Sequence, residues 1–373
     1  MKYTGKIVKQ QDLKRCAFAR KFDQLAHSLQ SENGLKLYDD KEIIAWINPK
    51  AKHGSKNLNF YAFDRIDYSE LNTFLNNLAL KEARLKALGY DLGGVKSFNR
   101  NVWIDLSRES SAIEGIMDDF PLDLSDFRTH LRGRFTIEPS TENFNKNDYF
   151  EKLYAQYEMV KKDNDSVIIN GNKKSHTLKI STIAHFIAFK YVYKCAKLNR
   201  GKGDLSAEDF ETVLKNASSL MSGNYAVSYR NDPAAVTGAE WRPAKPAEIY
   251  DKMKALSQWM VDDPESSRLH PIEKAALFHA EFIRIHPFAD GNGRTGRIMA
   301  NYVLIKNEIP TIAVRYRKTE DYFAALNKAI TTHEADDLIE MFYKEVYANA
   351  KKIDECLDWI EKNKNPQNKD RDK

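Results

Sequence analysis

Cysteine is scarce in this chain of 373 residues, which contains only Cys16, Cys195 and Cys356. The three positions are far apart, and none lies in a CxxC pair or in the Cys/His spacing of a metal site. We therefore expect free thiols in a reducing compartment, not a disulfide framework or a zinc site.

Long apolar runs are also missing. No stretch approaches the roughly 18 apolar residues of a membrane span, and the longest apolar run, at residues 183–192, contains His185 and Lys190. The first 21 residues carry seven basic side chains but no apolar run of signal-peptide length. The sequence thus predicts a cytoplasmic protein with no membrane partner.

The chain has little excess charge of either sign. Lys and Arg number 58 against 53 Asp and Glu, which leaves a formal net charge of +5. This excess is too small to indicate a nucleic-acid partner by itself. With 42% hydrophobic and 30% charged residues, the composition is that of a globular protein with two or three domains.

Helical spacing of apolar residues dominates, so we expect a mainly α fold. One strand pair is predicted between Tyr225 and Arg242, because residues 235–237 are followed by Gly238. A turn is predicted at residues 170–172. The predicted helices span residues 99–117, 180–198, 206–220, 246–260, 271–284, 294–306 and 320–329.

The most informative stretch is His286-Pro-Phe-Ala-Asp-Gly-Asn-Gly-Arg-Thr-Gly-Arg297, which joins two of these helices. Gly291, Asn292 and Gly293 let the backbone turn sharply with its N–H groups pointing inward. The next helix begins directly behind them with the positive end of its dipole. Such a loop binds anions, and phosphates in particular.

The other side chains of this stretch suit a phosphate substrate. Arg294 and Arg297 lie one turn apart on one helix face and can reach phosphate oxygens. Asp290 offers a hard oxygen ligand for Mg²⁺. His286 titrates near neutral pH and can accept a proton from a hydroxyl group. A transition-metal site would need a third clustered ligand, so we favour phosphate chemistry, with Phe288 anchoring the loop.

This stretch resembles the HxFx(D/E)GNGRxxR signature of Fic domains and matches it at every defined position. The resemblance covers about residues 100–345, and its flanking matches are His270-Pro271, His279, Asn301 and Tyr322. It implies a helical core with a short β-hairpin flap and a site for Mg-ATP. It also implies that His286 is the catalytic base.

The resemblance further implies which residues bind the nucleotide. These are Asp290, Gly291, Asn292, Gly293, Arg294, Arg297 and Tyr322. In this assignment Asp290 is the metal ligand and Asn292 contacts the α-phosphate. The two glycines line the anion nest, and the two arginines hold the β and γ phosphates. Tyr322 stacks on adenine or packs in the core, whereas His279 and His185 are expected to be structural.

Residues Ala235, Val236, Thr237 and Gly238 resemble the flap that pairs with an extended target segment. The Gly-Xaa-Arg that often precedes this flap is Ser228-Tyr229-Arg230 here. This departure leaves the register of the flap open.

A second motif, Ser110-Ser-Ala-Ile-Glu114-Gly115, resembles the (S/T)xxxE(G/N) inhibitory motif of some Fic proteins. Ser110 and Glu114 are four residues apart and share one helix face. By this resemblance Glu114 pairs with Arg297 and withholds it from the γ-phosphate, so the resting enzyme should be weak.

The sequence therefore predicts a protein adenylyltransferase that moves AMP from Mg-ATP to a Ser, Thr or Tyr hydroxyl of a target protein. The protein is also expected to modify itself. Open alternatives are transfer of UMP, phosphocholine or a γ-phosphate, removal of AMP, and a nucleotide-binding regulator or toxin partner without activity. The oligomeric state also stays open. The four predicted parts are an accessory region (1–95), the inhibitory helix and connector (96–170), the catalytic core (171–345), and a C-terminal helix with a charged tail (346–373).

Overall fold

The computed structural model of the chain describes residues 52–55, 60–62, 66–116, 144–161, 166–170, 175–198, 205–263 and 266–363. Most of the predicted accessory region, Cys16 and the charged tail after Asn363 lie outside these ranges. Among the described residues, Cys195 and Cys356 take part in no disulfide.

The described residues are mainly helical, as predicted. The α-helices are α4 (Ser69–Ala87), α5 (Gly93–Ile113), α7 (Lys146–Lys161), α8 (Ile180–Leu198), α9 (Ala207–Ser222), α10 (Pro246–Asp262), α11 (Pro271–Ile285), α12 (Asn292–Lys306), α13 (Thr319–Thr332) and α14 (Asp336–Asn363). Two 3₁₀ helices are η1 (Ser266–Arg268) and η2 (Tyr316–Lys318), and four strands are β1 (Lys52–Ser55), β2 (Phe60–Ala62), β3 (Ser166–Asn170) and β4 (Ser175–Lys179).

Helix ends follow the chemistry of their capping residues. The Ser206 side chain accepts a hydrogen bond from the Asp209 N–H at the start of α9, as the Ser-x-x-Asp pattern predicts. Pro271 occupies the first turn of α11, and His270 and Glu273 form a reciprocal capping box there. These caps explain why the predicted and observed starts of α9 and α11 agree closely.

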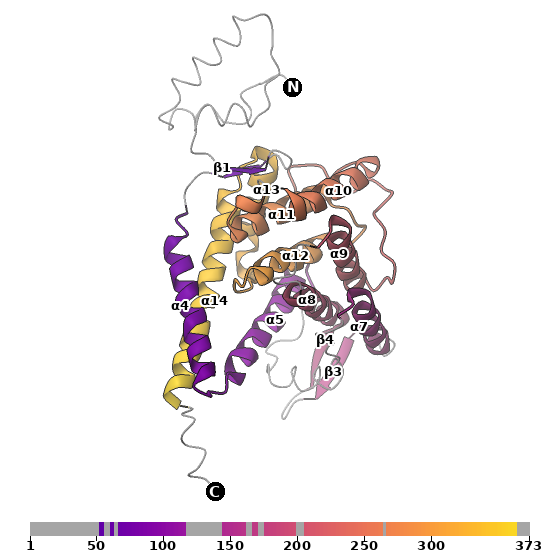
Figure 1. Cartoon of the computed structure of the whole chain (residues 1–373). Coiled ribbons are helices and arrows are strands. Elements are labelled where there is room, and N and C mark those ends of the chain that lie inside the picture. The colour runs from indigo at the N-terminus through magenta and orange to yellow at the C-terminus, as the bar shows by residue number, and fades with distance from the viewer. Residues whose placement is uncertain are drawn as a thin grey trace, which may run out of the picture.

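Helices α11 and α12 form the centre of the fold and pack against each other. Helices α8 and α9 also contact α12, while α10 and α13 lie against α11 (Figure 1). A Cβ added at Gly296 would lie 3.0 Å from both His279 Nδ1 and Phe282 Cδ1. Because only glycine fits there, α12 can approach α11 closely, and this fixes the loop between them.

Helix α14 runs along one side of the molecule, where α4 and α5 pack against it (Figure 1). Lys81 of α4 bonds Asp354 of α14 at 2.6 Å and also bonds Asp358. The contact joins segments more than 270 residues apart, so it links α4 to the C-terminal helix.

Two of the three predicted boundaries between the four parts fall inside helices. The boundary at 95 lies within α5, and the one at 345 lies within α14. The Gly93-Gly94 pair, interpreted as a break, forms the first turn of α5, where the Gly93 N–H donates to Asp91 Oδ1 at 2.9 Å. The boundary at 170 falls between paired strands β3 and β4, which meet at Asn170 and Ser175.

The strand pair predicted between Tyr225 and Arg242 is absent from this described segment. The segment is irregular and contains one turn, in which the Ala239 N–H donates to the Val236 carbonyl at 3.1 Å. The Arg230 side chain bonds the Asp232 carbonyl within this segment and the Ala244 carbonyl just after it. The observed antiparallel pairs are β1–β2 and β3–β4.

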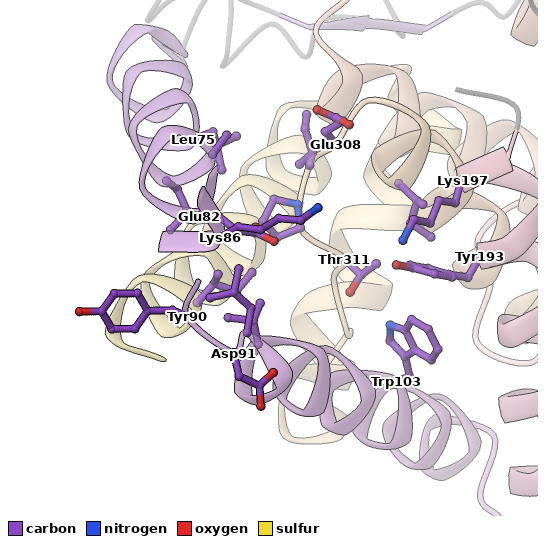
Figure 2. A pocket seen from close by; sticks show the side chains of 18 residues that line it. Leu75, Glu82, Lys86, Tyr90, Asp91, Trp103, Tyr193, Lys197, Glu308 and Thr311 are labelled. Carbon is purple, nitrogen blue, oxygen red and sulfur yellow. The ribbon is translucent and has the colours of Figure 1, made fainter. Parts of the chain in front are cut away.

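A cavity of about 610 Å³ lies between α4, α5, α8 and residues 305–311. Figure 2 shows Leu75 and Glu82 on the α4 side of this cavity, with Trp103 and Tyr193 facing them from α5 and α8. No residue of the 286–297 stretch lines it, so this cavity is distinct from the predicted site. Among the described residues, no helix is both long and apolar enough to cross a membrane.

Candidate active site

The loop from His286 to Gly291 connects the C-terminus of α11 to the N-terminus of α12. It is bounded by two left-handed residues, His286 with φ 53° and Gly291 with φ 77°. Glycine adopts this conformation freely, whereas a residue with a side chain is strained there by about 1–3 kcal/mol. The surrounding structure must therefore hold His286 in place.

The inner side of the loop is held by Asn292. Its side-chain Oδ1 accepts the Phe288 N–H at 2.9 Å, and its Nδ2 donates to the Phe288 carbonyl at 2.8 Å. The Phe288 ring is buried and packs near Phe282 and Tyr229. The predicted anchoring role of Phe288 is confirmed. Both polar atoms of the Asn292 side chain are hydrogen-bonded within the loop, and these bonds fix the turn.

The first turn of α12 forms an anion-binding geometry. The N–H groups of Asn292, Gly293 and Arg294 have no acceptor within the helix, because the first intrahelical bond runs from Thr295 to the Gly291 carbonyl. They lie at the positive end of the helix dipole. A phosphate placed here would meet N–H donors.

Glu114, the C-cap of α5, lies over this same turn. A Cβ added at Gly293 would overlap Glu114 Oε1. The same oxygen accepts a hydrogen bond from Arg297 Nη2 at 2.8 Å. Arg297 also donates from Nε to Ser110 Oγ at 2.8 Å and from Nη2 to the Ser110 carbonyl at 3.0 Å. Both residues of the SxxxE motif thus contact the last arginine of the loop motif.

Arg294 also belongs to the first turn of α12, and its side chain is 7% exposed. It donates to Ser181 Oγ at 2.7 Å and to Asp290 Oδ2 at 3.1 Å. The Asp290 carboxylate itself is 78% exposed and open to solvent. Ser181 begins α8 and was not found by sequence reasoning, because no local pattern indicates a contact across 113 residues.

The environment of His286 favours its neutral form. Burial lowers the pKa of His286 below its usual value of 6.5, and the positive charge of Arg230 lowers it further. The Ile283 carbonyl and the Glu114 and Asp290 carboxylates act in the opposite direction and weaken the shift. The imidazole is therefore mostly neutral at pH 7, which is the form that a general base requires.

Residues 207–304, from α9 to near the end of α12, match the family model described as Fic/DOC. This segment of the chain is thus similar to the Fic/DOC family. The resemblance stated from the loop motif is thereby confirmed, and the matched residues include the entire loop.

Two proteins that are similar to part of this chain are named as enzymes. Protein adenylyltransferase Fic of Nematostella vectensis is 37% identical over 118 residues, which cover 31% of this chain and 26% of that protein. A probable protein adenylyltransferase of Aquifex aeolicus is 28% identical over 181 residues, or 48% of this chain and 51% of that protein. The chain thus spans about a quarter to a half of the length of these two relatives.

A solved structure shares the fold. The Fic domain-containing signaling protein from Bacteroides thetaiotaomicron aligns with a TM-score of 0.52 at 18% identity and covers 76% of this chain and 97% of that one. At this identity the likeness concerns the fold alone. It agrees with the helical architecture around the loop.

The Tyr322 side chain lies in the protein core in this structure. It is fully buried on α13, and its hydroxyl lies 2.7 Å from His279 Nε2. Burial lowers the pKa of His279 to about 3, and Arg297 contributes to the shift. Of the two options from the sequence, this environment is that of core packing, and the nucleotide-binding role of Tyr322 stays a prediction. His279 is likewise buried in the core.

His185 is likewise a core residue, as expected. It is fully buried on α8, and its Nδ1 lies 3.1 Å from Ser107 Oγ. Burial lowers the pKa of His185 well below its usual value.

The residues predicted to form the flap lie at the surface. Ala235, Thr237 and Gly238 are exposed and Val236 is half-buried. Asn327 of α13 anchors the segment, because it donates to the Gly238 carbonyl at 3.3 Å and accepts from Trp241 Nε1 at 3.1 Å. The segment is thus accessible although it lacks strand structure.

Proposed function

We propose that this protein transfers AMP from ATP to a Ser, Thr or Tyr hydroxyl of a target protein. The supporting observation is that His286, whose pKa is lowered by burial, begins the loop that leads into an anion-binding turn carrying Arg294 and Arg297. The related enzymes are named protein adenylyltransferases. A pure binding protein would need the anion-binding turn but not the base.

In the proposed reaction the target hydroxyl oxygen attacks the α-phosphorus of ATP. A new P–O bond forms, the bond between the α-phosphorus and the bridging oxygen to the β-phosphate breaks, and pyrophosphate leaves. His286 accepts the hydroxyl proton. Its Nδ1 is buried, so Nε2 is the ring nitrogen that we assign to this proton. The N–H groups of the α12 turn hold the phosphates and stabilise the developing charge.

Asp290 fits a role in holding Mg²⁺ that arrives with ATP. Its exposed carboxylate has one oxygen bonded to Arg294, which leaves the other accessible. Among the residues that the structure describes, no group of three His, Cys, Asp or Glu could hold a metal. A metal here would therefore take most of its ligands from phosphates and water, as Mg²⁺ commonly does, and would neutralise charge on the leaving group.

Labelled ATP tests the reaction class. Incubation of the protein and its host lysate with α-labelled and γ-labelled ATP in parallel should label protein from the α position alone. Label from the γ position would mean phosphate transfer, and label from neither would contradict the proposal. Parallel reactions with labelled UTP and CDP-choline cover the other groups, and loss of label from a pre-modified target would indicate AMP removal.

Replacing Asp290 with alanine is expected to reduce transfer and to raise the Mg²⁺ concentration needed for half-maximal rate at least about tenfold. High Mg²⁺ should restore the rate only in part. The matched control is Asp321→Ala, which removes another exposed carboxylate, on α13. An unchanged Mg²⁺ dependence in Asp290→Ala, or full activity with the metal chelated, would exclude Asp290 as the ligand.

We also propose that Glu114 restrains this activity. The support is that its carboxylate occupies both the first turn of α12 and the fork of Arg297, where a nucleotide phosphate would bind. Transfer should then require Glu114 to leave the turn. The exposed residues 235–238 are the segment that we assign to target positioning.

A further inference from the structure

Arg230 is a buried arginine whose side chain, among the described residues, bonds only main-chain oxygens. It is 7% exposed and lies in the segment between α9 and α10. Nε donates to the His286 carbonyl at 2.7 Å, and Nη2 donates to the Ile285 carbonyl at 3.4 Å. The Arg230 backbone N–H donates to the Pro287 carbonyl at 2.9 Å. One residue therefore holds three successive carbonyls at the end of α11.

The same guanidinium group reaches both ends of the segment that carries residues 235–238. Nη1 donates to the Asp232 carbonyl at 2.6 Å, and Nη2 donates to the Ala244 carbonyl at 2.5 Å. Asp232 precedes the flap residues and Ala244 follows them. Arg230 thus links the base loop to the two ends of the flap segment.

These bonds have a direct consequence for His286. The direction of its imidazole depends on its backbone angles, which lie in the left-handed region. A bond to its carbonyl, together with one on each neighbouring carbonyl, fixes the peptide planes on both sides of it. A cation at this position also suits the negative end of the α11 dipole.

We propose that Arg230 is a positioning residue, which fixes the left-handed His286 backbone and the flap segment in one frame so that base and target hydroxyl meet in a constant geometry. This inference deepens the proposed function and rests on the role of His286 as the base. Arg230 itself touches no substrate.

The test compares Arg230→Lys with Arg284→Lys. A lysine at 230 keeps the charge, but its three ammonium donors cannot reproduce the planar fork. Arg284, two residues before His286, pairs with the Glu281 carboxylate at 2.7 Å and is the matched control. Both are made in the wild-type chain and in a Glu114→Gly chain, so that a low resting rate does not hide a loss.

Arg230→Lys is expected to lower the transfer rate at saturating ATP about 100-fold, because misplacing a catalytic group by about 1 Å has an effect of this size. ATP affinity from calorimetry should stay within about twofold, and Arg284→Lys should transfer at close to the parent rate. A near-parent rate in Arg230→Lys would overturn the inference. Equal losses of rate and ATP affinity would do so too, since they indicate general damage to the site.

A second measurement does not depend on activity. Hydrogen exchange followed by mass spectrometry should show faster exchange in residues 231–245 and 286–291 together in Arg230→Lys, and in neither segment in Arg284→Lys. A change in only one segment, or across the whole chain, would contradict a local frame. If the labelled-ATP experiment fails but these segments respond together, the proposed function fails while the frame stands.

Discussion

Replacing His286 with alanine is expected to reduce the transfer of label from α-labelled ATP about 100-fold to 10,000-fold, which is the usual contribution of a general base. ATP binding should stay within about twofold of wild type, because the imidazole acts on the hydroxyl and the α12 turn holds the phosphates. Isothermal calorimetry measures the binding. A variant that loses ATP affinity but keeps its turnover would make His286 a binding residue instead.

The pH dependence follows from the same group. A base must be neutral, and burial lowers the pKa of His286 below 6.5. The transfer rate should therefore be full at pH 7 and above, and should fall as the pH drops through a pKa that lies below 6.5. The residual rate of His286→Ala should lack this acidic limb. A limb centred above pH 7 would contradict the assignment.

The sequence predicted the loop better than any other part of the site, because the chemistry of the loop is local. Gly291 and Gly293 lie where the backbone needs a left-handed turn and room for a carboxylate. The SxxxE spacing placed Ser110 and Glu114 on one face, and both contact Arg297 in the structure. Patterns within a few residues set the turn and the shared helix face, whereas the pairing of Glu114 with Arg297 was implied by the family resemblance.

Contacts across the chain could not be read in the same way. Arg230 bonds carbonyls up to 56 residues away, and backbone acceptors leave no sequence signal. Residues 235–237 followed by Gly238 predicted a hairpin, but in the structure the side chains of Arg230 and Asn327 bond backbone carbonyls of this region. Tyr322 belonged to the family pattern, and its burial against His279 depends on how α13 packs on α11. Motifs identified the residue types, and packing decided which of them face the site.

The contact between Glu114 and Arg297 is a competition for one guanidinium group. Arg297 is 5% exposed and Glu114 is 38% exposed, so the pair is partly screened by solvent. A charge-assisted bond of this kind contributes about 1.5–3 kcal/mol, and solvent exposure places this one toward the lower end. Its removal should favour productive nucleotide binding about tenfold or somewhat more.

Glu114→Gly and Glu114→Gln should therefore both raise transfer from α-labelled ATP about tenfold or more. The glutamine variant keeps the shape of the side chain and removes only its charge, so it separates electrostatic release from a change in backbone freedom. Arg297→Ala should not raise the rate, because it frees the turn but removes a phosphate contact. The double variant Glu114→Gly with Arg297→Ala should match Arg297→Ala alone.

Glu109→Gln is the control for simple loosening of α5. Glu109 lies on the same helix, but it accepts the Tyr316 N–H at 2.6 Å and lies 3.6 Å from Arg315 Nη1, away from the loop. Its replacement should change transfer less than about twofold if the Glu114 carboxylate itself blocks the turn. An unchanged rate in Glu114→Gly, with the protein folded by circular dichroism, would show that α5 does not gate the site. A gain in Glu109→Gln equal to that in Glu114→Gly would assign the effect to the helix rather than to the pair.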